Sequence, residues 1–228
     1  MLGYDVGDAW WDEGGGAAKA RAWFDANAKS VLDAANIDVE LRFAVVDNTA
    51  KKPGPVFTAI TRDAYYGAKA DYIYRVNDDT ELATPWAGAL VRALATMDNV
   101  GAVGPMCRQG NRKILTHDFT HRTHMAIFDG QYYPPALSDW WMDDWISRVY
   151  GMDRTLRADA VEVVHHTGKH GQRYAVDKSH ARLLDGLLNS GGGTIRAHIA
   201  KSKAAVAPPP PGFSRFAFTA KKRRGKNG

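Results

Sequence analysis

One short stretch of the chain, residues 70–80, constrains its fold more than any other. It reads ADYIYRVNDDT, a β-branched and aromatic run that stops abruptly at adjacent carboxylates. Such a run predicts a buried strand, and in an α/β protein the carboxyl edge of the sheet is where ligands bind. Two neighbouring acids repel each other unless a positive charge lies beside them, and carboxylate oxygens suit Mg²⁺ or Mn²⁺. The alternative interpretation is an acidic turn in which Asp79 or Thr80 only caps the next helix.

Predicted strands and helices alternate in the first half of the chain. Apolar spacing predicts helices at residues 17–35, 55–69 and 84–97, and strands at residues 39–46, 70–76 and 100–103. This alternation favours βαβ units, and 228 residues are enough for one sizeable domain. We therefore expect a single α/β domain over residues 1–200, in which helices flank a mostly parallel central sheet.

The second half follows a different pattern. Residues 114–133 predict a hairpin that turns at Asp129-Gly130. Further along, the sequence predicts helices at residues 138–150 and 175–188, a strand at 159–165, and a short last helix after the glycines at 191–193. The proline-rich and basic residues 201–228 are predicted to be a disordered tail.

Residues 138–146, which read SDWWMDDWI, carry three tryptophans beside paired acids. At helical spacing Trp141 and Trp145 share a face, and Asp144 lies next to that face. Aromatic rings beside an acid suit a sugar, and apolar walls raise the pKa of a carboxyl so that it becomes a better base near neutral pH. Alternatively, Asp139 and Asp143 are first-turn residues that the helix dipole favours, and the tryptophans belong to the core.

Histidines form two further groups. Residues 161–170 read VEVVHHTGKH, which places His165 and His166 at the end of a strand, where a neutral imidazole could complete a metal site begun by Asp79. The other group is His117, His121 and His124. Along a strand His124 would face away from the other two, which argues against a three-histidine zinc site unless the hairpin bulges.

Bulk properties exclude several classes of protein. The net charge of +5 comes from six cations beyond Ala207, without which the chain carries about one net negative charge, so no whole-surface nucleic-acid footprint exists. Cys107 is the only cysteine, which excludes an internal disulfide. No run approaches the roughly 18 apolar residues that span a bilayer, and no signal peptide opens the chain. Since the opening residues resemble the end of a strand, we expect that the N-terminal strand is truncated.

Taken together, these segments resemble a glycosyltransferase of the GT-A type, over residues 3 to about 188. The acidic DxD motif of that family is matched by residues 77–79, with asparagine where the first aspartate usually stands. The resemblance implies that Asp79 binds the metal directly and that Asp78 approaches the ribose or a metal-bound water. It also implies that His166 completes the metal shell, with His165 the competing choice. The segment Met142-Asp143-Asp144 is similar to the acidic triplet of inverting members, which implies that Asp143 and Asp144 are catalytic residues and that Asp144 is the base.

The remaining site residues follow from the same resemblance. It implies that the nucleotide-sugar donor is bound by Tyr4, Asp5, Asp47, Arg62, Asn77 and Asp78. The acceptor side is expected at Trp140, Trp141 and His117.

The implied activity is transfer of a sugar, with inversion, from a nucleoside diphosphate, expected to be uridine-linked, to a hydroxyl of a glycan, protein or lipid. It would use Mn²⁺ or Mg²⁺ and no nucleic acid. By analogy with relatives in the Golgi lumen, any membrane attachment would lie in a segment outside this chain. Two alternatives stay open at this point. One is a zinc-dependent hydrolase built on the histidines and Asp118, and the other is a non-catalytic carbohydrate-binding relative.

Overall fold

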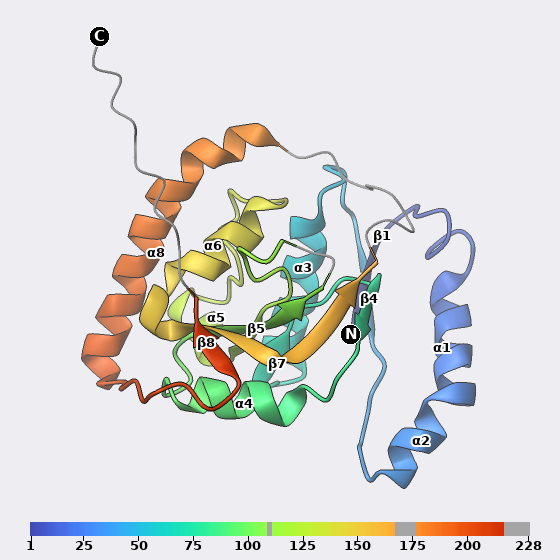
Figure 1. Cartoon of the computed structure of the whole chain (residues 1–228). Helices are drawn as coiled ribbons and strands as arrows, with labels where there is room; N and C mark the ends of the chain where they lie inside the picture. The colour runs from blue at the N-terminus through green and yellow to red at the C-terminus, as the bar shows by residue number, and fades with distance from the viewer. Residues whose placement is uncertain (109–110, 167–176, 217–228) are drawn as a thin grey trace.

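Two separate sheets organise the part of the chain that this computed structural model describes, residues 1–108, 111–166 and 177–216. A parallel pair consists of β1 (Leu2–Asp5) and β2 (Phe43–Val46). The larger sheet has the strand order β3-β6-β5-β7-β4, and β8 also pairs with β7. Its strands are β3 (Tyr72–Tyr74), β4 (Thr80–Leu82), β5 (Ala102–Cys107), β6 (Phe119–His121), β7 (Thr155–His165) and β8 (Phe213–Arg215). The fold is therefore mixed α/β (Figure 1).

The larger sheet is not the mostly parallel sheet that we expected. Among the described strands only β5 and β7 pair in parallel within it, and the other pairings are antiparallel. Two of these antiparallel pairings involve β6, which enters between β3 and β5 instead of folding into the hairpin predicted for residues 114–133. The turn at Asp129-Gly130 exists, with positive φ at both residues, but it follows the short helix α5 (Thr123–Ile127). Pairing partners are non-local, so residue alternation alone cannot specify them.

Helices cover both faces of this sheet. Besides α5, the helices of the described residues are α1 (Gly16–Asn27), α2 (Lys29–Ala34), α3 (Pro53–Arg62) with its π-helical extension η1 (Asp63–Gly67), α4 (Ala87–Ala95), α6 (Trp141–Val149) and α8 (Ala181–Ser202), together with the short turns η2 (Met152–Arg154) and η3 (Lys178–His180). Figure 1 shows α4 on one side of β5 and β7 and α6 and α8 on the other. Accordingly, Val103 packs in the core with Leu90 of α4, whereas its neighbour Ala102 belongs to the core that contains Trp145.

The C-terminal part of the chain is more regular than predicted. Helix α8 runs straight through the glycines at 191–193, because Gly191 lies against Val149 and Trp145 and so packs closely on α6. Residues 201–216 also differ from the expected disordered tail: β8 pairs with β7, and Phe216 is 4% exposed. Residues 217–228 lie outside the described residues, as do 167–176, which include His170 and the predicted start of a helix at 175.

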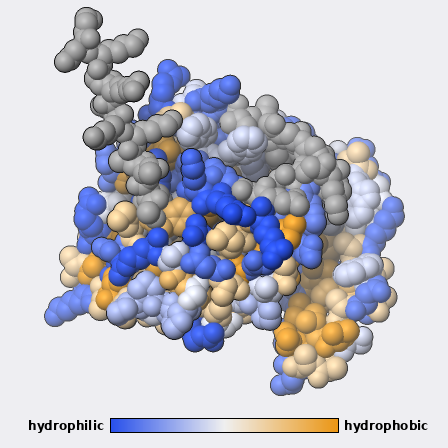
Figure 2. Space-filling view, viewed as in Figure 1, coloured by the Kyte–Doolittle hydropathy of each residue, from blue (hydrophilic) through white to orange (hydrophobic). Residues whose placement is uncertain are grey.

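The N-terminal helices bury little. Only Gly16 is buried in α1, and no residue of α2 is. Trp23 and Val31 are exposed, and Figure 2 shows a hydrophobic surface at the end of the molecule where Figure 1 places α2. Among the described residues, no helix has both the length and the apolar character required to cross a membrane.

Candidate functional site

The acidic segment lies at the edge of the larger sheet, in the loop that joins β3 to β4. Its backbone is closed by a hydrogen bond of 3.2 Å from the Thr80 amide to the Asn77 carbonyl. Strand β4 then pairs antiparallel with the end of β7, so that Thr80 lies opposite His165. The sheet pairing therefore brings the acidic loop beside the histidines, as the sequence predicted.

His165, and not His166, faces Asp79. The Nε2 atom of His165 lies 3.0 Å from Oδ1 of Asp79 and 3.1 Å from Nδ2 of Asn77. His166 instead places its Nε2 3.1 Å from the exposed Glu81 carboxylate. The geometry thus favours His165 over His166 as the partner of Asp79, because side chains alternate between the two faces of a strand and only one of these neighbours can point toward the loop.

The Asp79–His165 pair fits a divalent cation. Oδ1 of Asp79 is buried and has no hydrogen-bond partner, although Nε2 of His165 is close by. Adjacent ligand atoms of an octahedral ion, each bound at about 2.0–2.1 Å, lie about 3 Å apart, which is the separation found here. Within the described residues no cluster of three or more His, Cys, Asp or Glu side chains could hold a metal. An ion at this pair would have to take its remaining ligands from water or phosphate.

Buried polar atoms without partners concentrate around this loop. Across the described residues, the atoms of this kind include Tyr74 Oη, Asp79 Oδ1, Thr116 Oγ1 and His117 Nδ1. Their two segments are neighbours, since the Arg75 amide donates to the Asp118 carbonyl at 2.9 Å. Most buried polar groups in folded proteins are paired, so such a concentration is typical of a place where a polar ligand or water binds.

A buried arginine joins the acidic loop to the tryptophan helix. Arg75 is 4% exposed, and it donates to Asp118 Oδ1 at 2.8 Å and to Asp143 Oδ1 at 2.6 Å. Asp118 also accepts hydrogen bonds from the hydroxyls of Tyr132 and Tyr133. The sequence reasoning did not include Arg75, although a single charge inside a buried apolar run was a visible signal.

The two adjacent aspartates of α6 have different surroundings. Burial raises the pKa of Asp143 to about 7, an effect that Asp118 and Asp144 reinforce and Arg75 opposes. Partial burial also raises the pKa of Asp144 above its ordinary value, and Arg148 opposes this shift. Asp143 forms the ion pair with Arg75, which leaves Asp144 as the half-buried neighbour beside it.

The start of α6 also anchors two other segments. Asp139 is 1% exposed, and its carboxylate accepts from the Asp177 amide at 2.7 Å and lies 3.4 Å from Lys52 Nζ and 3.2 Å from His180 Nδ1. Trp141 donates its indole N–H to the Asp177 carbonyl. Trp140, by contrast, is 56% exposed, so it is the tryptophan here that could contact an acceptor.

The residues expected to bind the nucleoside lie around β1 and β2. Asp5 is buried and accepts a hydrogen bond of 2.8 Å from the Asn48 side chain, while Asp47 is exposed. Tyr4 stacks on Trp11, with ring centroids 5.8 Å apart. Asn48 and Trp11 were not predicted. The signal for Asn48 was its position directly after Asp47 at the end of β2.

Two predicted site residues have other roles. Arg62 is the last residue of α3, about 14 Å along the helix axis from Pro53, and its guanidinium lies over the Tyr66 ring and near the Gly130 carbonyl. It is therefore not at the nucleotide end. His117 is 1% exposed, so it cannot contact an acceptor. Its Nε2 lies 2.8 Å from Thr80 Oγ1, and burial, aided by Arg75 and His165, lowers its pKa to about 2.

The histidine cluster proposed for zinc does not assemble. Both ring nitrogens of His124 are engaged, by the Tyr150 hydroxyl at 2.8 Å and the Tyr132 carbonyl at 2.7 Å. His121 instead contacts Thr123 through Nδ1. Burial lowers the pKa of His124 to about 4. These imidazoles serve the packing of α5, and they offer no shared metal position with His117.

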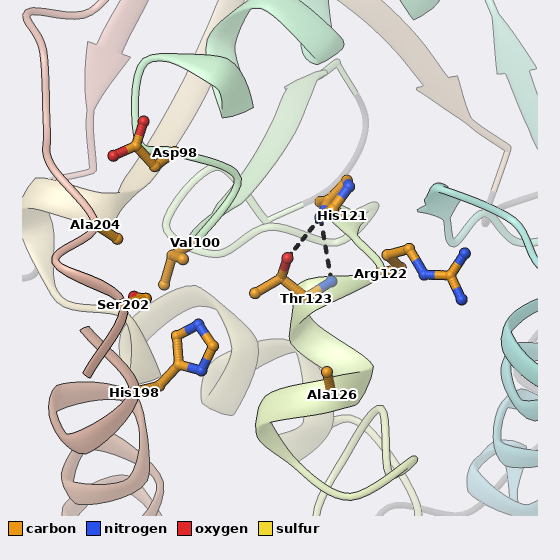
Figure 3. A pocket seen from close by; sticks show the side chains of 9 residues that line it. All are labelled: Asp98, Val100, His121, Arg122, Thr123, Ala126, His198, Ser202 and Ala204. Carbon is orange, nitrogen blue, oxygen red and sulfur yellow. Dashed lines mark hydrogen bonds between the residues drawn. The ribbon is translucent and has the colours of Figure 1, made fainter. Parts of the chain in front are cut away.

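A cavity of about 530 Å³ lies away from the acidic loop (Figure 3). It is lined by residues of β6, α5 and α8, including His121, Thr123 and His198. His121 pairs with Tyr72 at the start of β3, whereas the acidic loop follows the end of that strand. Arg122 points out of the cavity toward the Lys69 carbonyl. The cavity is therefore separate from the candidate site.

Comparison of the chain with protein-family models, with curated proteins and with solved structures gives no match.

Proposed function

We propose that this chain is a metal-dependent glycosyltransferase that moves a sugar from a nucleoside diphosphate to an acceptor hydroxyl. The observation that carries the proposal is the Asp79–His165 pair, 3.0 Å apart at the sheet edge, with Arg75 tying the same loop to the acids of α6. This arrangement combines a two-ligand cation site with Asp143, which Arg75 joins to the same loop. Asp144, whose pKa is raised by partial burial, is the next residue along α6. The resemblance of residues 3–188 to GT-A enzymes supports the same reaction.

Asp79 and His165 would hold Mn²⁺ or Mg²⁺. When bound, such an ion supplies Lewis-acid stabilisation of the charge on a leaving diphosphate. Asp78, an exposed residue of the same loop, and Asn77, whose amide lies beside His165, would face the ribose and phosphates. Tyr4, Asp5 and Asp47, at the ends of the separate parallel strands, are the proposed contacts for the nucleoside.

Asp144 would act as the general base. Asp143 already accepts from Arg75, so its role is to fix α6 against the acidic loop. The partly buried carboxylate of Asp144 has a raised pKa, which makes it a stronger base at a working pH above that pKa. It would take the proton of the acceptor hydroxyl as that oxygen attacks the anomeric carbon and the bond to the diphosphate breaks, with inversion. The exposed ring of Trp140 would pack against the acceptor.

The decisive experiment compares two carboxylates in one assay. Asp144→Asn should lose about 10²–10⁴-fold in transfer but keep Mn²⁺-dependent binding of uridine diphosphate, because general-base catalysis contributes about that much. Asp79→Ala should lose the Mn²⁺-dependent binding itself. Transfer is measured with a panel of nucleotide sugars and binding by calorimetry. An Asp144→Asn variant as active as the wild type would refute the assignment of the base.

Matched histidine variants test the metal site. His165→Ala should abolish the effect of Mn²⁺ on nucleotide binding, whereas His166→Ala, which loses only an exposed contact with Glu81, should retain it. The reverse result would restore His166 as the ligand. Wild-type protein that binds glycans but neither Mn²⁺ nor any nucleotide sugar would indicate a carbohydrate-binding protein instead.

A further inference from the structure

The buried imidazole of His117 lies directly behind the proposed cation pair. Its Nε2 is 2.8 Å from the hydroxyl of Thr80, the residue that follows Asp79. Its ring also meets the ring of His165 edge to face, with centroids 5.0 Å apart and planes at 80°. The His117 side chain therefore contacts both the residue that follows Asp79 and the ring of His165.

The backbone of His117 is held firmly in place. The Arg75 guanidinium donates to the Thr116 carbonyl at 2.5 Å, and the Arg75 backbone amide donates to the Asp118 carbonyl at 2.9 Å. On the other side the His117 carbonyl packs on Gly104, where a Cβ would lie only 2.8 Å from that oxygen. The imidazole thus projects from a fixed base in the core.

The strand that begins at Thr80 is less well supported. Strand β4 has three residues, and among the described strands it pairs only with the end of β7. Two ligand atoms must be held close to their bound geometry for a cation to bind tightly, and groups that orient ligands commonly contribute about 10–100-fold in affinity.

We propose that His117 is a positioning residue for the cation site. Its Nε2 holds the Thr80 hydroxyl, and its ring backs His165, so that Asp79 Oδ1 and His165 Nε2 stay at the separation of neighbouring ligands. This inference rests on the proposed function and adds to it a buried residue that touches neither substrate nor metal.

The test is a titration of the 228-residue chain with Mn²⁺ alone, in which electron paramagnetic resonance measures the free and bound Mn²⁺. His117→Phe keeps a buried ring but cannot bond Thr80, and Thr80→Val removes the hydroxyl. Each should weaken Mn²⁺ binding by about 10–100-fold. The double variant should be no weaker than either single one, because both remove the same contact. His117→Gln can place an amide nitrogen near the Nε2 position, and Thr80→Ser keeps the hydroxyl, so both should stay within about threefold of wild type.

His124→Phe is the matched control. His124 is also 1% exposed and fully hydrogen-bonded, but its partners are Tyr132 and Tyr150. This variant should lower the melting temperature without changing Mn²⁺ affinity. If His117→Phe fails to fold, the partly exposed Thr80→Val and Thr80→Ser pair carries the comparison.

Two results would overturn the inference, and they differ from each other. Wild-type affinity in both His117→Phe and Thr80→Val, with the wild type binding Mn²⁺, would show that His117 only fills space and would leave the proposed function intact. A wild-type chain that binds no Mn²⁺ would remove the cation site itself, and the role of His117 with it.

Discussion

Arg75 and Asp143 meet inside the protein, where each has to replace the water that it loses on folding. The guanidinium satisfies Asp118 as well, and it lies over the rings of Phe57 and Tyr133 at 5.0 and 5.8 Å. One cation thus serves two carboxylates, and burial outweighs its attraction for Asp143, whose pKa rises to about 7. Removing one partner of such a pair leaves an uncompensated charge, so the arrangement specifies a geometry more than it adds stability.

This shift predicts a pH dependence of stability. The pKa of Asp143 is higher in the folded chain than the value of about 3.9 for an unfolded one, so the folded state binds more protons between about pH 4 and pH 7. Its contribution is therefore fully present at low pH, and it is lost as the pH rises through that window. Asp143→Asn should remove this loss, which amounts to a few kcal/mol. Melting temperatures of both proteins from pH 4 to pH 8 test it, and parallel curves would contradict it.

At the scale of elements, the residues just before α6 and its first turn hold the site together. Asp139 fixes Lys52 and the start of α8, and the Ser138 carbonyl accepts from the Gly54 amide at 2.9 Å. Asp143 connects to the acidic loop through Arg75. The β1–β2 pair and the larger sheet share no strand, so these contacts set how the two halves of the site face each other.

Two glycines of α8 should respond oppositely to alanine. At Gly191 a Cβ would lie 2.8 Å from Val149 Cγ2 and 3.2 Å from Trp145, so Gly191→Ala should destabilise the chain by about 1–3 kcal/mol through overpacking. At Gly193 only the flexible end of Arg196 comes within 4 Å, so Gly193→Ala should stabilise it by about 0.5–1 kcal/mol. Urea denaturation of the two variants measures both effects. Changes of the same sign would show that packing on α6 does not explain the uninterrupted helix.

Local patterns predicted most elements but not how the strands pair. The predicted helices 84–97 and 138–150 overlap α4 and α6, and the predicted strand 39–46 includes β2, because apolar period depends on near neighbours. The insertion of β6 and the addition of β8 depend on distant partners, which no local pattern reports. At the site, the acids and the histidines could be predicted to lie close together because each group follows the end of a predicted strand. Arg75 and the buried role of His117 could be assigned only once the pairing was known.

At the scale of the whole molecule, β7 joins segments that lie far apart in the sequence. This strand pairs with β5 along one edge and with both β8 and β4 along the other. Arg154 also joins the segment after α8 to the residues that follow α4. It donates to the carbonyls of Met97, Val100 and Ala204. The segment after α8 is thus an integral part of the core, although its composition predicted disorder.

The contribution of this segment can be measured at its last described residue. Phe216 is 4% exposed, so Phe216→Ala should cost about 3–5 kcal/mol, as is usual for truncating a buried aromatic side chain. Arg215→Ala, which removes an exposed contact with Asp153, should change stability by less than about 1 kcal/mol. Thermal unfolding of both variants distinguishes them. Equal melting temperatures would show that the segment does not pack on the core.

The length of β7 has a practical consequence for attaching the protein to a dye or to a sensor surface. Its first residues pair with β8 and its last, His165, faces the acidic loop, so the two sites lie at opposite ends of the strand. A fluorophore or a sensor-surface tether attached on β8, at the partly exposed Ser214, would leave the acidic loop at the other end of β7 open to small solutes. Immobilised protein could then be used directly for ligand screening.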